Sequence, residues 1–267
     1  MACYANLGIW HRQWNGIRTS FEGGGGRRVT NAQVVKPSMK SSADPRQFWK
    51  ERLRLPAYGV GDAAKYAQIT GETIRNWQRL RNMPSPLGPR EKGKALSYLQ
   101  LIELAVVAAA RAAGVPLWAV RETREYMRRE FDSEFPFAEY RFKTDGKKLW
   151  IDYIDLVGRK GRGKLLETSG KGQLAWTEII GRLKEFEYDR RLGLAVRWHV
   201  AGQRSPVVID PRIRFGAPSV DGVPTRLIAR RWSKGEDSED IADDFDLPIV
   251  AVAAALRFEG VETRRST

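Results

Sequence analysis

The stretch that decides the fold reads YGVGDAAKYAQITGETIRNWQRL and covers residues 58–80. Apolar residues recur at helical spacing from Val60 to Ala67, and the pair Thr70-Gly71 then interrupts the pattern. Thr70 belongs to the residue types that cap helix N-termini, so a second helix is expected to start there. The apolar face of this second helix consists of Ile74, Trp77 and Leu80. The stretch therefore predicts two short helices joined by a tight turn, a helix-turn-helix unit.

The second helix of this unit directs polar and basic side chains away from the predicted core. Side chains of these types read base edges or clamp phosphate. An arginine-rich helix face is often merely solvated, but the helix pair, the glycine turn and the basic second helix together favour DNA binding. The predicted DNA-binding residues are Thr70, Thr73, Arg75, Asn76, Gln78, Arg79 and Arg81, with Arg90, Lys92 and Lys94 in the proline-rich basic loop that follows.

The charge of the chain is unevenly distributed. The formal net charge is +14 over 267 residues. Residues 1–56 hold 10 basic and 3 acidic side chains, whereas residues 204–267 hold 10 and 11. A basic surplus attracts polyanions, of which nucleic acid is the commonest in a cell. We therefore expect two kinds of partner, one for the basic half of the chain and one for the near-neutral C-terminal part.

Several function classes are disfavoured by composition. Cys3 is the only cysteine, so neither a disulfide framework nor a cysteine-rich zinc site is expected, and we predict no cofactor or metal. The longest apolar run, residues 101–115, is too short to span a bilayer and contains two charged residues. The first 20 residues lack the apolar core of a signal peptide. Neither His11 nor His199 lies in a recognisable catalytic context. We therefore predict a cytoplasmic, nucleoid-associated protein that is not an enzyme and does not contact a membrane.

The chain divides into four predicted segments with an α+β, mostly α, fold. Residues 1–44 contain a run of glycines and scattered basic residues, which indicates a disordered basic arm that tracks phosphate or a dispensable leader. Residues 45–131 form the helix-turn-helix domain, completed by two long helices. Residues 132–203 form a β-containing linker domain, and residues 204–267 form a small helical domain. The two long helices are expected from Leu96 to Ala113 and from Pro116 to Phe131. The first carries an apolar stripe of Leu99, Ile102, Val106 and Ala110, which could form core or a dimer seam; we favour core, with dimer contacts nearby.

The linker domain is predicted to hold short strands around one helix. The spacing G-x-x-x-x-G-K at residues 158–164 is similar to a phosphate-binding loop, but Leu165 stands where a Ser or Thr would hold Mg²⁺. A basic, glycine-rich turn is therefore favoured there. The expected elements are a hairpin of residues 141–142 and 149–151 around an Asp145-Gly146 turn, a helix over residues 176–186 and a strand over residues 192–200.

The C-terminal segment is predicted to hold a short strand over residues 207–209 and three helices. Thr225 is expected to cap a helix that starts at Arg226 and ends at Gly235. A second helix is expected from Ser238 to Phe245, and a third from Pro248 to Phe258. The predicted core of these helices comprises Leu227, Ile228, Ile241, Phe245, Val250, Ala254 and Leu256.

Seven acidic residues occur between Glu236 and Asp246. Three interpretations are open. The cluster is a solvated helix N-terminus, where the helix dipole favours acidic residues, or it contacts a basic protein partner, or it binds a divalent metal. The spacing does not match the EF-hand pattern.

Two stretches of the chain resemble known families. The run YGVGDAAKYAQITGETIRNW, followed by a basic loop and YLQLIELAVVAAARAAGVPLWAVRE, resembles the winged helix-turn-helix of the MerR family over residues 57–130. The resemblance implies that residues 70–81 form the turn and recognition helix and that residues 90–94 form part of the wing. The proline-rich wing and the pair Asn76-Trp77 depart from the usual pattern, and the effector cysteines of metal-sensing members are missing.

The C-terminal segment resembles the domain of unknown function 433 found in VapB-like antitoxins. The matching motifs are Asp210-Pro211, Gly216-Ala217-Pro218, and Gly222 with Thr225-Arg226. In that family, such proteins repress their own operon and neutralise a toxin with a PIN-like ribonuclease fold. The resemblance implies a toxin-binding or structural motif formed by Asp210, Gly216, Pro218, Gly222, Thr225 and Arg226.

Together these observations predict a DNA-binding antitoxin of a type II toxin–antitoxin pair. It would act as a homodimeric repressor on double-stranded operator DNA and would bind a PIN-like toxin. The alternatives are a free-standing MerR-like transcription regulator without a toxin and an adaptor that binds protein only.

Overall fold

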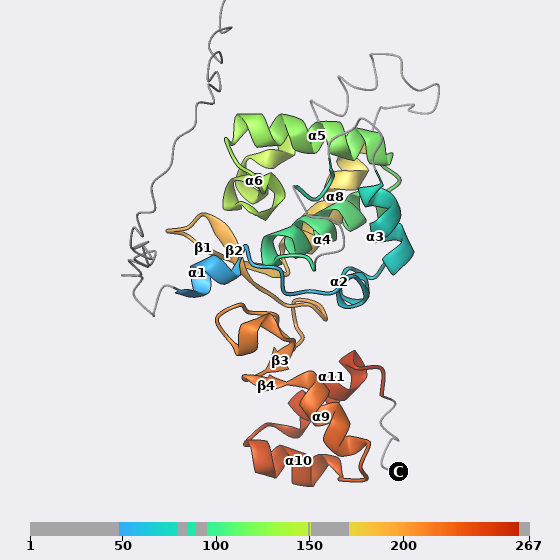
Figure 1. The fold of residues 1–267 in the computed structure, drawn as a ribbon, viewed down its shortest axis with the longest axis vertical. Coiled ribbons are helices and arrows are strands. Elements are labelled where there is room, and N and C mark those ends of the chain that lie inside the picture. The colour runs from blue at the N-terminus through green and yellow to red at the C-terminus, as the bar shows by residue number, and fades with distance from the viewer. Residues whose placement is uncertain (1–47, 80–84, 89–94, 149, 151–170, 262–267) are drawn as a thin grey trace, which may run out of the picture. The chain divides into compact units, whose positions relative to one another are not determined.

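The computed structural model describes residues 48–79, 85–88, 95–148, 150 and 171–261 (Figure 1). The described chain is α+β and mostly helical, with two small two-stranded sheets. All of these residues belong to one compact unit, Ala43–Thr267.

The first helices follow the capping signals of the sequence. Helix α1 spans Phe48–Arg52, α2 spans Val60–Ala67 and α3 spans Gly71–Gln78. Gln68 ends α2 in the left-handed conformation, with φ of 57°. Thr70 caps α3, and its hydroxyl accepts a hydrogen bond from the Thr73 amide at 3.1 Å. The predicted positions of both helices and of the cap are confirmed.

Helix α4, Tyr98–Ala112, is the central helix of the fold. A capping box formed by Ser97 and Gln100 starts it, and the chain turns after it at Gly114, whose φ is +84°. Every residue from Tyr98 to Ala110 is buried, including the charged Glu103. The predicted core stripe is therefore correct but incomplete, because neighbouring elements cover the opposite face of the helix as well. Those neighbours include α5, Leu117–Glu130; α8, Lys171–Leu183; and the short 3₁₀ helix η2, Pro136–Ala138.

The hairpin predicted after residue 140 is wrong. Residues 140–144 form helix α6, Tyr140–Thr144, and Asp145 is the C-cap of this helix rather than a hairpin turn residue. The helix buries Phe142 against Phe137, with ring centroids 4.8 Å apart, and against Trp150, with centroids 6.4 Å apart. This aromatic packing favours the helix although the Asp-Gly pair is typical of a hairpin.

One strand of the linker domain was predicted and its partner was not. Strand β2, Leu194–Trp198, lies within the predicted strand. It pairs antiparallel with β1, Phe186–Asp189, with Phe186 opposite Trp198. The predicted helix over residues 176–186 is confirmed as α8, but α8 ends at Leu183 and Phe186 belongs to the sheet.

The C-terminal segment contains a turn-rich connection and three helices. The elements are η3, Arg214–Gly216; β3, Ser219–Val220; β4, Val223–Pro224; α9, Thr225–Trp232; α10, Ser238–Phe245; and α11, Ile249–Phe258. Strands β3 and β4 pair antiparallel. In place of a strand over residues 207–209, Val208 forms a single bridge to Ser219 and Ile209 forms one to Trp198.

Two further details of the C-terminal prediction are wrong. Thr225 is not the N-cap of α9, because Pro224 holds that position and the Thr225 hydroxyl instead donates to the Pro218 carbonyl oxygen at 3.3 Å. Val250 is 70% exposed rather than part of the core, because it lies in the first turn of α11. Ile228, Ile241 and Leu256 are buried as predicted.

Candidate nucleic-acid interface

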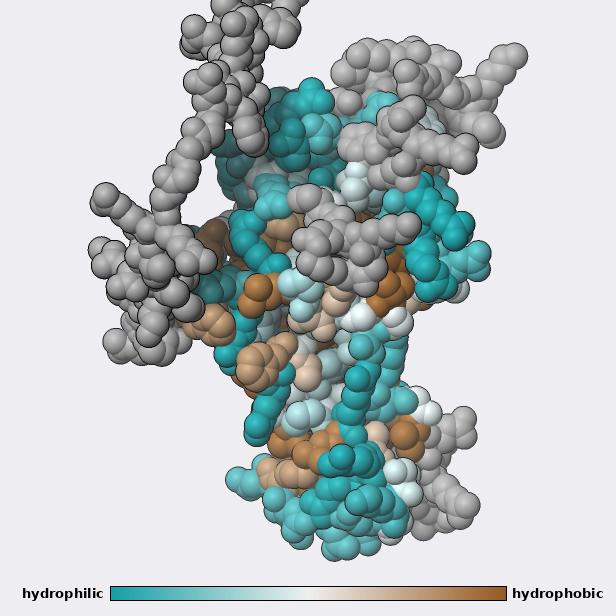
Figure 2. All heavy atoms as spheres, in the orientation of Figure 1, coloured by the Kyte–Doolittle hydropathy of each residue, from teal (hydrophilic) through white to brown (hydrophobic). Residues whose placement is uncertain are grey.

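Helix α3 buries one face and exposes the other. Ile74 and Trp77 are buried, whereas Arg75, Asn76 and Arg79 are exposed. Thr73 and Gln78 are half-buried at the edges of the exposed face. The space-filling view shows hydrophilic residues over the region where α3 lies in the ribbon (Figure 2). The helix therefore presents two guanidinium groups and an amide outward while its apolar side chains anchor it.

Both ends of α3 are fixed to the rest of the fold. At the N-terminal end, the Ile69 amide donates to the Ala64 carbonyl oxygen at 3.0 Å, which holds the turn before Thr70. At the C-terminal end, Arg121 of α5 donates from Nη2 to the Trp77 carbonyl oxygen at 2.8 Å. An arginine beside the last turn also complements the helix dipole. These contacts hold the exposed face of α3 in a defined orientation.

The exposed arginines of α3 make no ion pair with any part of the chain that the structure describes. Arg75 and Arg79 therefore keep their charge available for an external anion. Glu72 is the acidic residue of α3, and it lies in the first turn, where the dipole favours a negative charge.

Several predicted DNA-binding residues lie outside the described part of the structure. They are Arg81, Arg90, Lys92 and Lys94, and the predicted wing lies outside it as well. The glycine-rich turn at residues 158–164 is also outside.

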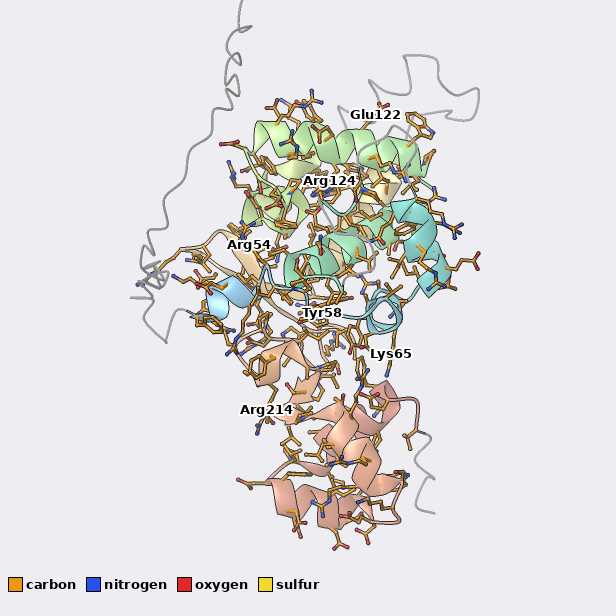
Figure 3. The ribbon with its side chains drawn as sticks, viewed as in Figure 1. Arg54, Tyr58, Lys65, Glu122, Arg124 and Arg214 are labelled. Carbon is orange, nitrogen blue, oxygen red and sulfur yellow. The ribbon has the colours of Figure 1, made fainter. Side chains whose placement is uncertain are left out.

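Helix α2 is fastened to the C-terminal helices by polar and aromatic contacts. Figure 3 labels two of its contact residues, Tyr58 just before the helix and Lys65 within it. The Lys65 ammonium group lies 2.8 Å from a Glu259 carboxylate oxygen and 4.7 Å from the centroid of the Phe258 ring. Tyr66 stacks on the same ring, with centroids 6.0 Å apart. A further ion pair joins Asp62 of α2 to Arg226 of α9. Helix α2 also packs against α3. The C-terminal helices therefore contact the exposed basic helix indirectly, through α2.

The predicted C-terminal motif residues take part in internal contacts. The Tyr58 hydroxyl donates to the Gly216 carbonyl oxygen at 3.2 Å, and a Cβ added at Gly216 would lie 2.1 Å from that hydroxyl. The Pro218 carbonyl oxygen accepts from the amide and the hydroxyl of Thr225. The Gly222 carbonyl oxygen accepts from Arg214 at 3.3 Å. These contacts shape the connection that leads into α9.

Asp210 is a buried carboxylate between two arginines. Its oxygens accept hydrogen bonds from Arg212 at 2.6 Å and from Arg197 at 3.0 Å. Burial alone raises the pKa of the Asp210 carboxyl, but the hydrogen bonds and charge of Arg212 outweigh burial and hold this pKa below its ordinary value. The carboxylate of the predicted Asp-Pro motif therefore ties the segment around Asp210 to Arg197 of strand β2.

The buried polar residues that position these helices were not predicted. Glu103 of α4 forms a buried ion pair with Arg124 of α5, and its second oxygen accepts from the Phe137 amide at 2.8 Å. Arg121 and Arg124 lie in α5, whose many charged residues would predict an exposed, solvated helix face. The apolar composition around Glu103 is the one signal that its charge requires a partner.

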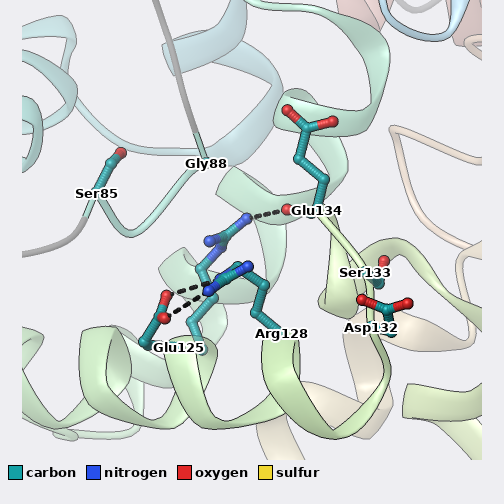
Figure 4. Close-up of a pocket in the computed structure, with 8 residues that line it drawn as sticks. Ser85, Gly88, Glu125, Arg128, Asp132, Ser133 and Glu134 are labelled. Atoms are coloured by element: carbon teal, nitrogen blue, oxygen red, sulfur yellow. Dashed lines mark hydrogen bonds and ion pairs between the residues drawn. The ribbon is translucent and has the colours of Figure 1, made fainter. Parts of the chain in front are cut away.

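A cavity of about 410 Å³ lies beside the buried ion pair (Figure 4). The two arginines that line it are already engaged: Arg124 donates to the Glu134 carbonyl oxygen at 2.5 Å, and Arg128 lies 2.9 Å from a Glu125 oxygen. The lining mixes acidic and basic side chains and so shows no preference for a ligand of either charge, and we assign none.

Within the described ranges, no group of three or more His, Cys, Asp or Glu residues is placed to hold a metal ion. No helix in the same ranges combines the length and apolar character needed to cross a membrane.

Comparison with known proteins identifies the C-terminal segment and the fold. Residues 207–258 match the family model described as protein of unknown function DUF433. The chain is similar over most of its length to the crystal structure of Rv2018 from Mycobacterium tuberculosis, with a TM-score of 0.60 and 21% sequence identity. The similarity covers 77% of this chain and 99% of that chain, and at this identity it shows the fold alone. No curated protein sequence matches the chain.

Proposed function

We propose that the protein is a DNA-binding antitoxin that represses its own operon and neutralises a PIN-like ribonuclease toxin. The observation that carries the DNA-binding part is the geometry of α3. This helix is capped at Thr70, anchored by Ile74 and Trp77, and directs Arg75 and Arg79 outward. In this account, residues 57–130 form a MerR-like winged helix-turn-helix and α3 is its recognition helix.

The proposed mechanism of DNA binding uses two copies of the chain. A homodimer would present two α3 helices to successive major grooves, about 34 Å apart. Arg75 and Arg79 would contact base edges or phosphates, and Lys92 and Lys94 would hold the backbone from the wing. The formal net charge of +14 supports a polyanionic partner.

The toxin-binding part rests on the C-terminal segment. Its match to DUF433 agrees with the family resemblance from which an antitoxin role was expected. Its acidic residues, in an otherwise basic chain, repel phosphate and favour a protein partner over DNA.

Co-expression with the neighbouring reading frame tests both parts in one strain. We expect the neighbouring product to be toxic alone, to lose its toxicity when this chain is present and to co-purify with it in fixed ratio. A reporter placed behind the chain's own promoter should be repressed, and Arg75→Ala combined with Arg79→Ala should relieve that repression. If the neighbouring product is not toxic and does not co-purify, the antitoxin role is wrong and a free-standing MerR-like regulator becomes the leading interpretation. If the reporter is not repressed, the proposed DNA binding is contradicted.

Point substitutions are better suited to this test than truncation after Gly202. The removed segment would include Ile209, which bridges to Trp198, and Gly216, which contacts Tyr58. Truncation would therefore disturb α2, and with it α3, whatever the role of the C-terminal helices.

A further inference from the structure

The connection between α10 and α11 repeats the connection between α2 and α3. In both cases an eight-residue helix ends in a left-handed residue, Gln68 with φ of 57° or Asp246 with φ of 52°. One apolar residue and one N-cap residue follow, and the second helix begins at once. The sequence does not reveal this repeat, because the two stretches share almost no residues.

The hydrogen bonds and the inward-facing residues repeat as well. The Ile69 amide donates to Ala64 at 3.0 Å, and the Leu247 amide donates to Ala242 at 2.9 Å, with the same spacing along the chain. Counted from the start of the second helix, the buried Ile74 and Trp77 of α3 correspond to Val252 and Ala255 of α11, which are also buried. The chain therefore contains two helix-turn-helix units of the same local geometry.

The outward faces of the two units differ in chemistry. Helix α3 and its C-cap expose Glu72, two arginines and an asparagine, whereas the first turn of α11 exposes Ile249, at 43%, and Val250, at 70%. These two are adjacent and belong to the few large apolar side chains that the described surface exposes. An adjacent exposed apolar pair can be buried at the centre of a protein interface, because that centre is more apolar than the surrounding rim.

The surroundings of this apolar pair are acidic. Asp243 and Asp246 are exposed, and neither makes an ion pair or a side-chain hydrogen bond within the described structure. Asp244, by contrast, is engaged by Arg231 at 2.5 Å. The sequence from Gly235 to Leu256 contains no lysine or arginine. The negative charges of Asp243 and Asp246 are therefore not neutralised by an ion pair within the described chain.

We propose that this corner, formed by Asp243, Asp246, Ile249 and Val250, docks on the nucleic-acid-binding surface of a protein partner. A surface that binds nucleic acid is basic, and carboxylates that occupy phosphate positions complement it while repelling DNA. The apolar pair adds burial at the centre of the contact. The inference rests on the proposed function, since the partner is the ribonuclease toxin, and it assigns the mode of neutralisation: the corner covers the basic surface that the toxin needs for RNA.

Two variants of the full-length chain test the proposal against the purified product of the neighbouring reading frame. Val250→Asp removes the apolar centre, and aspartate is well tolerated in the first turn of a helix. Asp243→Asn with Asp246→Asn removes the charge, and asparagine accepts the left-handed conformation of residue 246. By isothermal titration calorimetry we expect each variant to raise Kd at least about tenfold. The wild-type complex should also weaken more steeply with salt than the complex of the asparagine variant.

Matched controls use equivalent residues elsewhere on the surface. Glu130→Gln with Asp132→Asn removes two exposed charges, and Asp132 is also left-handed, with φ of 48°. Leu55→Asp replaces an apolar residue that is 48% exposed. Both controls should bind like the wild type.

The outcomes separate the proposal from the function on which it rests. If the neighbouring product binds the wild type and the corner variants equally, the docking surface is wrong and the antitoxin function stands. If the neighbouring product does not bind the wild type, both the docking surface and the proposed antitoxin function are wrong. If Val250→Asp instead converts a wild-type oligomer to a smaller species in light scattering, the corner is an interface between copies of this chain, which also overturns the proposal.

Discussion

Replacing Gly216 by alanine tests the contact that joins the connection before α9 to Tyr58. Gly216 has φ of +79°, and an added Cβ would lie 2.1 Å from the Tyr58 hydroxyl oxygen. Tyr58 is buried, so its ring has little room to move away. A non-glycine residue in the left-handed region costs about 1–2 kcal/mol, and overpacking a buried site costs about 1–3 kcal/mol. We therefore expect Gly216→Ala to lower the free energy of unfolding by about 2–5 kcal/mol.

Urea denaturation of the full-length chain measures this change, and Gly222→Ala is its control. Gly222 has φ of +82°, but an added Cβ there meets only Ile213, at an ordinary 3.8 Å. The control should lose about 1–2 kcal/mol, from the backbone conformation alone. Tyr58→Phe removes the clashing oxygen, so in the Gly216→Ala background it should restore most of the difference between the two alanine variants. Equal losses for both glycines, or no recovery with Tyr58→Phe, would refute the reasoning.

Three further predictions concern stability. Thr70→Ala removes the α3 cap and should cost about 1 kcal/mol in urea denaturation; an unchanged midpoint would show that the cap contributes nothing. Arg124→Met leaves Glu103 buried without its cation and should cost about 3–5 kcal/mol at neutral pH. Adding Glu103→Gln should recover part of that loss, and a double variant no better than the single one would contradict the pairing. The pKa of Asp210 is held low by Arg212, so its contribution to stability is present above the unfolded-state pKa of about 3.9 and is lost as pH falls through the folded-state pKa. Asp210→Asn should therefore lose less stability than the wild type on acidification below about pH 4, and equal acid sensitivity would contradict this assignment.

Helices whose ends are marked by capping residues or proline could be predicted from the sequence. The cap at Thr70 placed α3, and the predicted second C-terminal helix has the same ends as α10, Ser238–Phe245. Pro248 placed the start of α11 to within one residue. In each case the deciding interaction joins residues only a few positions apart, so the sequence alone carries it.

Contacts between distant residues explain the predictions that were wrong. The Asp145-Gly146 pair indicates a hairpin, but packing of Phe142 against Phe137 and Trp150 selects a helix. The full burial of α4 depends on contacts with α8, Lys171–Leu183, which lies far along the chain from α4, and an amphipathic pattern cannot reveal it.

The candidate site was predicted in part for the same reason. The exposed face of α3 follows from the helical spacing of Ile74 and Trp77. The packing of the α2 region against the C-terminal segment cannot be predicted from such local spacing, because the residues in contact, such as Tyr58 and Gly216, are 158 positions apart. The repeat of the helix-turn-helix geometry in α10 and α11 was also hidden, since only backbone conformation is shared.

The measurement that tests the central claim most directly is the salt dependence of binding to DNA from upstream of the chain's own gene. Fluorescence anisotropy would compare the wild type, the variant Arg75→Ala with Arg79→Ala, and a control with Arg128→Ala and Arg129→Ala. The account predicts that the α3 variant binds more weakly and that the slope of log K against log salt becomes shallower by about two, while the control keeps nearly the wild-type slope. An α3 variant with wild-type affinity and slope would contradict the claim that α3 binds DNA.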